Sequence, residues 1–353
     1  MITDSRHKTG IVRDNTYLDH CPAPGHPEAP ARLEEIYGLL DSFDFQGRLV
    51  SIPPRPATRE EILLAHAPDY FDLVSATAGR ETCALTADTH VSAGSFAAAQ
   101  LAVGGVLEAV RTVVTTDLAN AFALIRPPGH HAEKNRAMGY CLFNNIAIGA
   151  IYARRVLQLQ RVLLIDWDVH HGNGTQHMFE DDPSVFFFSI HQYPHFPGTG
   201  FFTETGRGKG EGYTANVAIG KGYGDGEYIY IFDRLLRPIA LAFKPELIIV
   251  SAGFDTHSAD RMGNMFMSHA GYAALTRIIM DIAAACCGGK VVLTLEGGYH
   301  LTALKESIQA VLLELAGLSF TDIEALSAQV DMHKINYVLK RFLPVHRRFC
   351  HNL

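Results

Sequence analysis

Short, uninterrupted runs of apolar residues recur along the chain and alternate with longer segments of helical periodicity. Apolar runs without polar alternation are typical of strands that are buried on both faces of a sheet. The runs that predict such strands are 119–125, 161–165, 185–191, 245–252 and 289–295. The segments that predict helices begin near Arg32 and continue at 60–73, 92–114, 139–154, 300–318 and 321–342.

Strands that alternate with helices predict an α/β fold, in which a central, mostly parallel sheet carries helices on both faces. The chain has no internal repeat and no shift of composition that would mark a linker. Its 353 residues, of which 48% are hydrophobic, can bury a sizeable core. A single domain is therefore the prediction.

Polar side chains follow the predicted strands directly. In open α/β sheets, ligands bind at the carboxyl ends of the strands, so these side chains should converge on one crevice. They are Asp166, Asp168 and His170 after the strand at 161–165, His130 and His131 after 119–125, Asp255 after 245–252, and Tyr299 after 289–295.

The first of these groups has the chemistry of a metal site. Asp166, Asp168 and His170 are spaced by two residues, so in an extended chain they point to one side. Two carboxylates and an imidazole suit zinc or a similar first-row ion. The alternative is a strand end whose aspartates cap the next helix, but the segment has little apolar content for packing. The remaining ligands must come from elsewhere in the chain.

His130 and His131 form a second candidate group. They follow Pro127, Pro128 and Gly129, which end the strand abruptly. The plainest interpretation makes them loop histidines. Two consecutive histidines after a buried strand are more useful as proton carriers, because their ordinary pKa lies near physiological pH.

Net charge and composition indicate which classes of partner and which cellular compartment are expected. A net charge of −7 argues against a dedicated nucleic-acid-binding protein and is compatible with cationic small molecules or basic peptides. The six cysteines form no Cys-x-x-Cys pair, so we expect them to be reduced. The first residues lack the order of a secretory signal, and no apolar run is long and uninterrupted enough to cross a membrane. A cytoplasmic protein without a membrane partner is the expectation.

Five ordered motifs resemble those of the zinc-dependent histone deacetylase and acetylpolyamine amidohydrolase superfamily. They are Arg-Pro-Pro-Gly-His-His, Asp-Trp-Asp-Val-His-His-Gly-Asn-Gly, Phe-Pro-Gly-Thr-Gly, Ser-Ala-Gly-Phe-Asp and Glu-Gly-Gly-Tyr. The similarity covers about residues 10–318. It implies an arginase-like single domain, with a catalytic domain at 1–318 and a C-terminal helical extension at 319–353 packed on it. Asn173, where many relatives carry Asp, resembles the class II branch and bacterial histone deacetylase-like amidohydrolases.

The resemblance implies a role for each residue of the crevice. One catalytic Zn²⁺ would be held by Asp168, His170 and Asp255. His131 would be the general base and acid, with His130 as its electrostatic partner. The supporting residues would be Asp166, which orients His130, Asn173, which holds His131 and makes it less basic than Asp would, and Tyr299, which donates its hydroxyl to the developing oxyanion.

Further sites are implied by the same resemblance. The substrate channel would involve Gly139, Tyr140, Phe196, Gly297 and Gly298, and Tyr140 replaces the more usual phenylalanine. One K⁺ would lie near Asp166, Asp168, His170, Ser189 and Ile190, and a second near Phe179, Asp182 and Val185.

For two further residues, the sequence alone also allows a role outside the active site. Arg32 would line an acetate passage, although its spacing alone favours a solvated helix residue. Asp88 would lie at the rim of the pocket, or else at the N-terminus of the helix that starts near Ser92.

The predicted function is zinc-dependent removal of acetyl or other acyl groups from acylated lysine side chains of proteins or peptides. The alternative substrates are acetylated polyamines or other small acyl-amines. A catalytically silent acyl-binding protein is the alternative from another class, but such a protein needs no pair of proton-carrying histidines. The chain could also act as a homo-oligomer, which is common among soluble proteins.

Overall fold

Eight parallel strands form the central sheet of the computed structural model, which describes residues 8–319, 321–350 and 353. All neighbouring strands in this sheet run parallel, and all but the edge strand β2 are fully buried. In spatial order the strands are β2 (Leu49–Ser51), β1 (Thr9–Val12), β5 (Asn120–Ala123), β10 (Val291–Leu295), β9 (Leu247–Ala252), β6 (Val162–Asp166), β7 (Val185–Gln192) and β8 (Thr214–Ile219).

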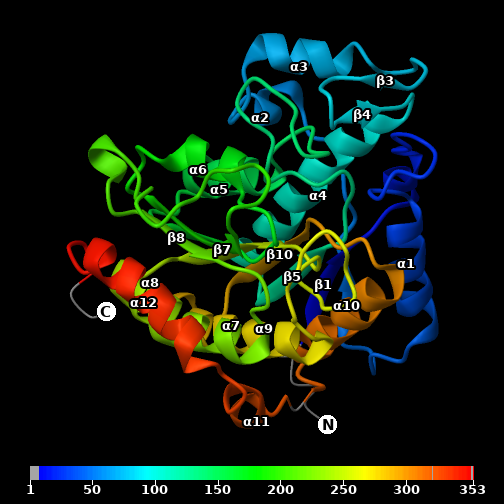
Figure 1. Cartoon of the computed structure of the whole chain (residues 1–353). Coiled ribbons are helices and arrows are strands. Elements are labelled where there is room, and N and C mark those ends of the chain that lie inside the picture. Colours follow the sequence, from blue (N-terminus) through cyan, green and yellow to red (C-terminus); the bar gives the residue numbers. More distant parts are fainter. Residues whose placement is uncertain (1–7, 320, 351–352) are drawn as a thin grey trace.

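Helices cover both faces of this sheet (Figure 1). One face carries α4 (Ser95–Thr115), α5 (Asn145–Arg155) and α6 (Asn173–Phe179), and the other carries α7 (Asp225–Ile231), α9 (His269–Cys287) and α10 (Leu301–Leu315). The remaining elements are η2 (Asn15–Asp19), α1 (Ala31–Ser42), α2 (Arg59–Ile62), α3 (Pro68–Ser75), β3 (Cys83–Ala84), β4 (His90–Val91), η3 (Gly208–Gly210), η4 (Phe232–Leu236), α8 (Arg237–Phe243), α11 (Ile323–Ser327) and α12 (Met332–His346). The predicted fold class is confirmed.

Three strands of the sheet escape the sequence pattern. β1, β2 and β8 are short or carry polar residues, and β8 follows a glycine-rich loop. Their strand conformation comes from pairing with neighbouring strands: β1 pairs with β5, and β8 pairs with the longer, apolar β7. Tertiary pairing of this kind leaves no periodicity in the local sequence.

Two predicted helices begin or divide at other places than expected. The helix predicted at 139–154 begins only at Asn145, because the Asn144 side chain accepts a hydrogen bond from the Ala147 N–H at 3.0 Å and caps α5 there. The prediction of one helix over 60–73 is wrong, since Pro68 starts α3 as a separate helix and residues before a proline avoid helical conformation. The loop at 139–144 is thereby free to face the carboxyl ends of the strands.

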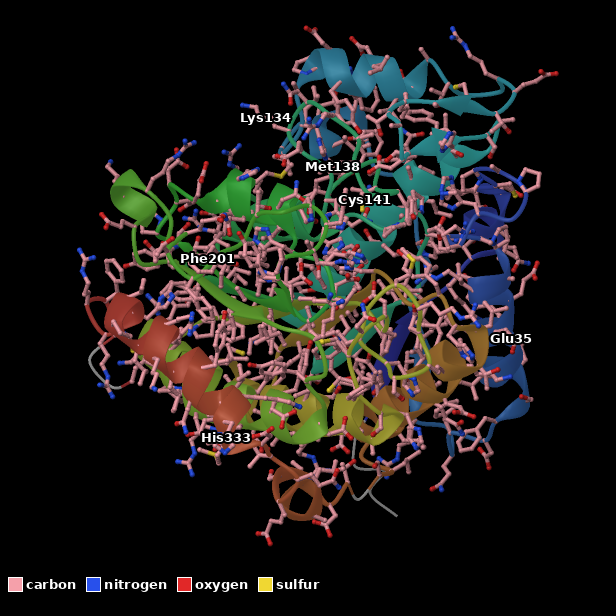
Figure 2. The ribbon with its side chains drawn as sticks, in the orientation of Figure 1. Glu35, Lys134, Met138, Cys141, Phe201 and His333 are labelled. Atoms are coloured by element: carbon pink, nitrogen blue, oxygen red, sulfur yellow. The ribbon has the colours of Figure 1, made fainter. Side chains whose placement is uncertain are left out.

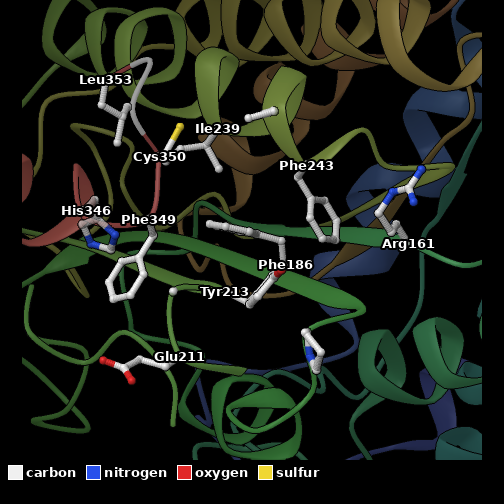
Figure 3. Close-up of a pocket in the computed structure, with 13 residues that line it drawn as sticks. Arg161, Phe186, Glu211, Tyr213, Ile239, Phe243, His346, Phe349, Cys350 and Leu353 are labelled. Carbon is white, nitrogen blue, oxygen red and sulfur yellow. The ribbon is translucent and has the colours of Figure 1, made fainter. Parts of the chain in front are cut away.

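The C-terminal helices pack on the same sheet. α12 buries Ile335, Val338 and Phe342 and contacts β8 and α7, while α11 also contacts α7. A cavity of about 380 Å³ lies between the end of α12, α8 and the amino ends of β7 and β8, where Phe186 and Tyr213 face His346 and Phe349 (Figure 3). This cavity is at the opposite end of the sheet from the predicted crevice.

Two helices, α4 and α9, have the length and mean hydropathy of a membrane span although neither is uninterrupted apolar sequence. Of the most apolar window in each, 67% and 61% is buried inside the protein. Core helices of a folded domain have the same properties.

His346 should make the protein less stable in acid. Its side chain is 2% exposed and stacks on Phe342, with ring centroids 4.0 Å apart. Burial lowers the pKa of His346 from 6.5 to about 4. Between these values the unfolded chain binds a proton that the folded protein does not. The free energy of unfolding therefore falls as the pH drops through this window, by at most about 1.4 kcal/mol per pH unit.

We expect His346→Phe, which keeps an aromatic ring against Phe342, to flatten the dependence of Tm on pH across that window and to leave it unchanged above neutral pH. Thermal unfolding of both proteins between pH 4.5 and 8 measures this. Parallel curves for the two proteins would contradict the assignment.

Candidate metal centre and active site

The crevice predicted from the sequence forms where four central strands end. β5, β10, β9 and β6 are consecutive neighbours in the sheet, so the segments that follow them meet at one edge. Register places the last residue of β6, Asp166, beside Ser251 of β9. The residues that follow these strands are the candidate ligands, histidines and tyrosine.

Asp168, His170 and Asp255 offer ligand atoms that all lie within 4.8 Å of one another. The His170 Nδ1 lies 3.0 Å from Asp168 Oδ1 and 3.2 Å from Asp255 Oδ2, and all three side chains are buried. Asp255 Oδ2 has no hydrogen-bond partner among the described residues, whereas Asp255 Oδ1 accepts from the Val169 N–H at 2.9 Å. A buried carboxylate oxygen that accepts no hydrogen bond is costly, and a divalent cation relieves that cost. The donor set of two carboxylates and one imidazole fits zinc and leaves a position open.

Position 297 requires glycine, because its backbone lies too close to the candidate ligands to leave room for a side chain. A Cβ on Gly297 would lie 2.3 Å from Asp255 Oδ2 and 2.6 Å from Asp168 Oδ2. The Gly297 N–H donates to Asp168 Oδ2 at 2.9 Å. Gly297 therefore lies against the candidate ligands, while a Cβ on Gly298 would meet Phe254 and Leu304. Both glycines are predicted in the channel, and neither is among the described residues that line the adjoining cavity.

His130 and His131 lie side by side, with ring centroids 4.0 Å apart, and each has a different partner. His130 Nδ1 donates to Asp166 Oδ2 at 2.9 Å, and His131 Nδ1 lies 2.7 Å from Asn173 Oδ1. All four side chains are buried. One histidine thus faces a carboxylate and the other faces a neutral amide.

His130 and His131 have pKa values that are shifted in opposite directions. Burial lowers the pKa of His130, but the carboxylates of Asp166 and Asp168 outweigh it and raise that pKa to about 10. Burial, with the neighbouring His130 and His170, holds the pKa of His131 well below its ordinary value. The sequence predicted a less basic His131 because of Asn173. The hydrogen bond to Asn173 acts against burial and raises the pKa of His131, so the comparison with an aspartate at position 173 stays a prediction. A neutral imidazole is available to accept a proton at neutral pH.

A cavity of about 240 Å³ leads to these residues. Its walls include Tyr140 and Phe196, and the Phe196 ring meets His131 edge to face at 5.1 Å between centroids. Tyr299 lies 6.1 Å from Tyr140 between ring centroids. The full lining is Asp88, His131, Gly139, Tyr140, His170, His195, Phe196, Met262 and Tyr299. Of the predicted catalytic residues, His131 and Tyr299 thus share one small, mainly aromatic space with the predicted channel residues Gly139, Tyr140 and Phe196.

Asp88 lies at this cavity and not at a helix N-terminus, since α4 begins at Ser95 with Gly94 as its cap. Its Oδ2 accepts from the Gly139 N–H at 3.1 Å, and its Oδ1 accepts from the hydroxyls of Thr86 and Thr89. Asp88 therefore fixes the loop that carries Gly139.

Arg32 is fully buried, so the solvated alternative is wrong. Its guanidinium donates to the carbonyls of Gly298 at 2.6 Å and Glu296 at 2.5 Å, and lies 5.0 Å from the centre of the Tyr299 ring. Glu28 pairs with it at 3.1 Å and also pairs with Arg126. Arg32 holds the backbone that presents Tyr299, and it is not among the residues that line the cavity in the described structure.

The residues of the first candidate K⁺ site lie around the ends of β6 and β7, and those of the second lie between α6 and β7. Asp166 is paired with Ser189 across β6 and β7, and Ile190 follows Ser189 in β7. Phe179 ends α6, Val185 begins β7, and Asp182 lies in the turn between them, where its N–H donates to the Phe179 carbonyl at 2.9 Å. The fold therefore brings the residues of each predicted site close together.

Two supporting carboxylates have no role in the sequence interpretation. Glu296 accepts from the N–H groups of Gly129 at 2.7 Å and His130 at 3.2 Å. Asp260 Oδ2 accepts from the N–H of Tyr299 at 2.6 Å. Glu296 directly follows β10, which was a usable signal, whereas Asp260 lies in an irregular loop that gives none.

Comparisons with known proteins agree with this geometry. The family described as the histone deacetylase domain matches residues 26–315. Polyamine deacetylase HDAC10 of Danio rerio is 39% identical over 317 residues, which cover 86% of this chain and 46% of that protein. A probable deacetylase of Archaeoglobus fulgidus is 37% identical over 321 residues, which cover 89% of this chain and 88% of that protein.

Among solved structures, the crystal structure of the HDA15 HD domain superposes with a TM-score of 0.89 at 36% identity, covering 98% of this chain and 96% of that one. The chain spans about half the length of several of the curated relatives, as with the 46% of the Danio rerio protein. The family match covers every strand of the sheet except β1, as well as the candidate ligands, the histidine pair and Tyr299. This chain belongs to the histone deacetylase domain family.

Proposed function

We propose that this protein is a zinc-dependent deacylase that hydrolyses the amide of acylated lysine side chains. The observation that carries the proposal is the juxtaposition, in one buried crevice, of the Asp168–His170–Asp255 group and the neutral His131. Amide hydrolysis by a metalloenzyme requires a metal with an open coordination position and a nearby base that accepts the proton of the water. A protein that only binds acyl groups does not need the base.

Asp168, His170 and Asp255 would hold the zinc, which when bound would polarise the acyl carbonyl and make water a stronger nucleophile. His131 would accept the proton of the attacking water at Nε2 as the new C–O bond forms, and would then return it to the nitrogen of the amide, whose C–N bond breaks as the amine departs. Tyr299 would donate its hydroxyl to the carbonyl oxygen as negative charge develops there. His130, held by Asp166, would add positive charge beside His131.

The shape of the cavity supports an acyl-lysine substrate. Its aromatic walls and volume of about 240 Å³ suit an extended aliphatic chain that carries a small acyl group. A polyamine would place further ammonium groups near the rim, where Asp88 is the carboxylate among the lining residues. That carboxylate already accepts hydrogen bonds from Thr86, Thr89 and Gly139. Bound K⁺ at the first candidate site, where Asp166 lies beside Ser189, would support the strand end that carries Asp168 and His170.

A paired substrate panel tests the proposal. Zinc-loaded protein would be assayed with acetyl-lysine peptides and acetylated polyamines, each also with longer acyl chains, and kcat/KM would be compared. We expect the highest kcat/KM for acetyl-lysine peptides. A preference for acetylpolyamines, as the name of the Danio rerio relative suggests, would replace the substrate assignment. Bound metal without turnover of any substrate would contradict the deacylase proposal itself.

A further inference from the structure

A line of hydrogen bonds leads outward from His131 through Asn173 to Glu133 and His177. Asn173 Oδ1 lies 2.7 Å from His131 Nδ1, and Asn173 Nδ2 donates to Glu133 Oε1 at 2.5 Å. His177 Nδ1 donates to the same Glu133 oxygen at 2.8 Å. The Glu133 side chain is 15% exposed and that of His177 is 39% exposed. The line therefore connects the buried imidazole to the surface.

Glu133 fixes which way the Asn173 amide points. An ionised carboxylate can only accept hydrogen bonds, so the NH₂ group of the amide must face it. The other neighbours of Asn173 Nδ2 are also acceptors, namely the His131 carbonyl at 3.4 Å and Met138 Sδ at 3.5 Å, but both are at the limit of a hydrogen bond. Figure 2 labels Met138 in the loop above the sheet. Glu133 is the partner at full hydrogen-bonding distance.

The amide orientation in turn decides where the proton of His131 resides. With Oδ1 of Asn173 facing Nδ1, that nitrogen must carry the proton, and Nε2 keeps its lone pair. Only this tautomer can accept a proton at Nε2. If Asn173 were reversed, its NH₂ group would face Nδ1, and the proton would move to Nε2. An aspartate at position 173 would accept from Nδ1 in either orientation, whereas an asparagine needs a further residue to orient it.

We propose that Glu133 is a positioning residue that sets the tautomer of His131 through Asn173. The inference rests on the proposed function for its meaning in catalysis, but the tautomer can be observed without turnover. Other charged groups near His131 are His130, His170 and Asp168, and none of them contacts Asn173 among the described hydrogen bonds. His177 is the titratable group that faces Glu133, and it donates to the oxygen that also accepts from Asn173.

The test compares Glu133→Ala, Glu133→Gln and an exchanged pair, in which Asn173→Asp is combined with Glu133→Gln. In the exchanged pair, the new carboxylate at position 173 would accept from His131, and the new amide at position 133 would donate to that carboxylate. The double variant thus still has one carboxylate and one amide in the line of hydrogen bonds, but the carboxylate is at position 173 and the amide at position 133.

Glu180→Ala is the matched control, because Glu180 is similarly buried near the surface at 21% exposure and pairs with Arg207 instead. Both kcat and KM would be measured with an acetyl-lysine peptide for every variant. ¹⁵N NMR of the histidine-labelled proteins would report the His131 tautomer.

We expect Glu133→Ala to lower kcat about 10- to 100-fold with little change of KM, as is usual for partners that orient a catalytic group. Glu133→Gln, which keeps the shape of the side chain and can point either way, should show a mixture of tautomers and an intermediate kcat. The exchanged pair should recover both the tautomer protonated at Nδ1 and most of the kcat. Glu180→Ala should resemble the wild type.

An unchanged His131 tautomer in both single variants at Glu133 would overturn the proposal. So would an exchanged pair that is as slow as Glu133→Ala, since the role would then be packing alone. A wild-type protein that hydrolyses no acyl amide, together with Glu133 variants that change the His131 tautomer, would instead contradict the proposed function and support the positioning role of Glu133.

Discussion

Asp255→Ala should remove the bound metal and nearly all hydrolytic activity. The substitution leaves Asp168 and His170 as two ligands, which is fewer than catalytic zinc sites use. It also deletes Asp255 Oδ2, the buried oxygen without a hydrogen-bond partner in the described structure. Because metal catalysis supplies several kcal/mol of stabilisation to the transition state, we expect kcat/KM to fall on the order of a thousandfold or more. Metal content by mass spectrometry and turnover of an acetyl-lysine peptide measure the two effects.

Asp225→Asn is the control for removal of a buried carboxylate. Asp225 accepts from the N–H and hydroxyl of Ser268 at the start of α9, away from the candidate ligands. This variant should lose some stability and keep its metal. Asp255→Ala protein that retained one equivalent of zinc and normal activity would show that the metal, or the catalytic group, lies elsewhere.

His131→Ala should lower kcat by about a hundred- to ten-thousandfold, the range of general acid–base catalysis, while the metal content stays unchanged. His131 is the neutral member of the pair and lines the cavity, so it is the histidine that can accept a proton there. His130 is held as a cation by Asp166 and Asp168. His130→Ala should therefore reduce kcat less than His131→Ala does. The two kcat values and the zinc content of each variant provide the measurement.

A larger loss in His130→Ala than in His131→Ala would reverse the roles assigned to the pair. Unchanged turnover in both would show that the histidines carry no proton in the reaction. Turnover absent from the wild type as well, with metal bound, would support the silent acyl-binding alternative.

The main residues of the site could be predicted from the sequence because each directly follows a buried strand. Asp168, His170, Asp255 and the histidine pair are examples, since the end of an apolar run places a side chain at a known edge of the sheet. Residues that act on the site from loops and helix termini could not be found in this way. Glu133 meets Asn173 only because the loop after β5 folds over the start of α6, which is a property of the tertiary structure.

The dependence on tertiary contacts also explains why the sequence pattern misses two strands and misplaces the start of one helix. β1 and β8 become strands by pairing with apolar neighbours, so their own residues carry little signal. The start of α5 at Asn145 depends on one capping side chain, which apolar periodicity cannot register. Arg32 shows the reverse error, because a charged residue on a helix resembles a solvated one until Glu28 and the two carbonyls are found around it.

The two outer strands of the sheet are protected in different ways. β8 is covered by α12, and Phe349 beyond that helix packs against Gly212 just before the strand. β2 is only three residues long and is followed closely by Pro53 and Pro54, which cannot donate backbone hydrogen bonds. In the described part of the chain, neither side of the sheet therefore offers a long open strand to another chain. The C-terminal segment thus guards against unwanted association as well as filling space, even though it lies far from the chemistry.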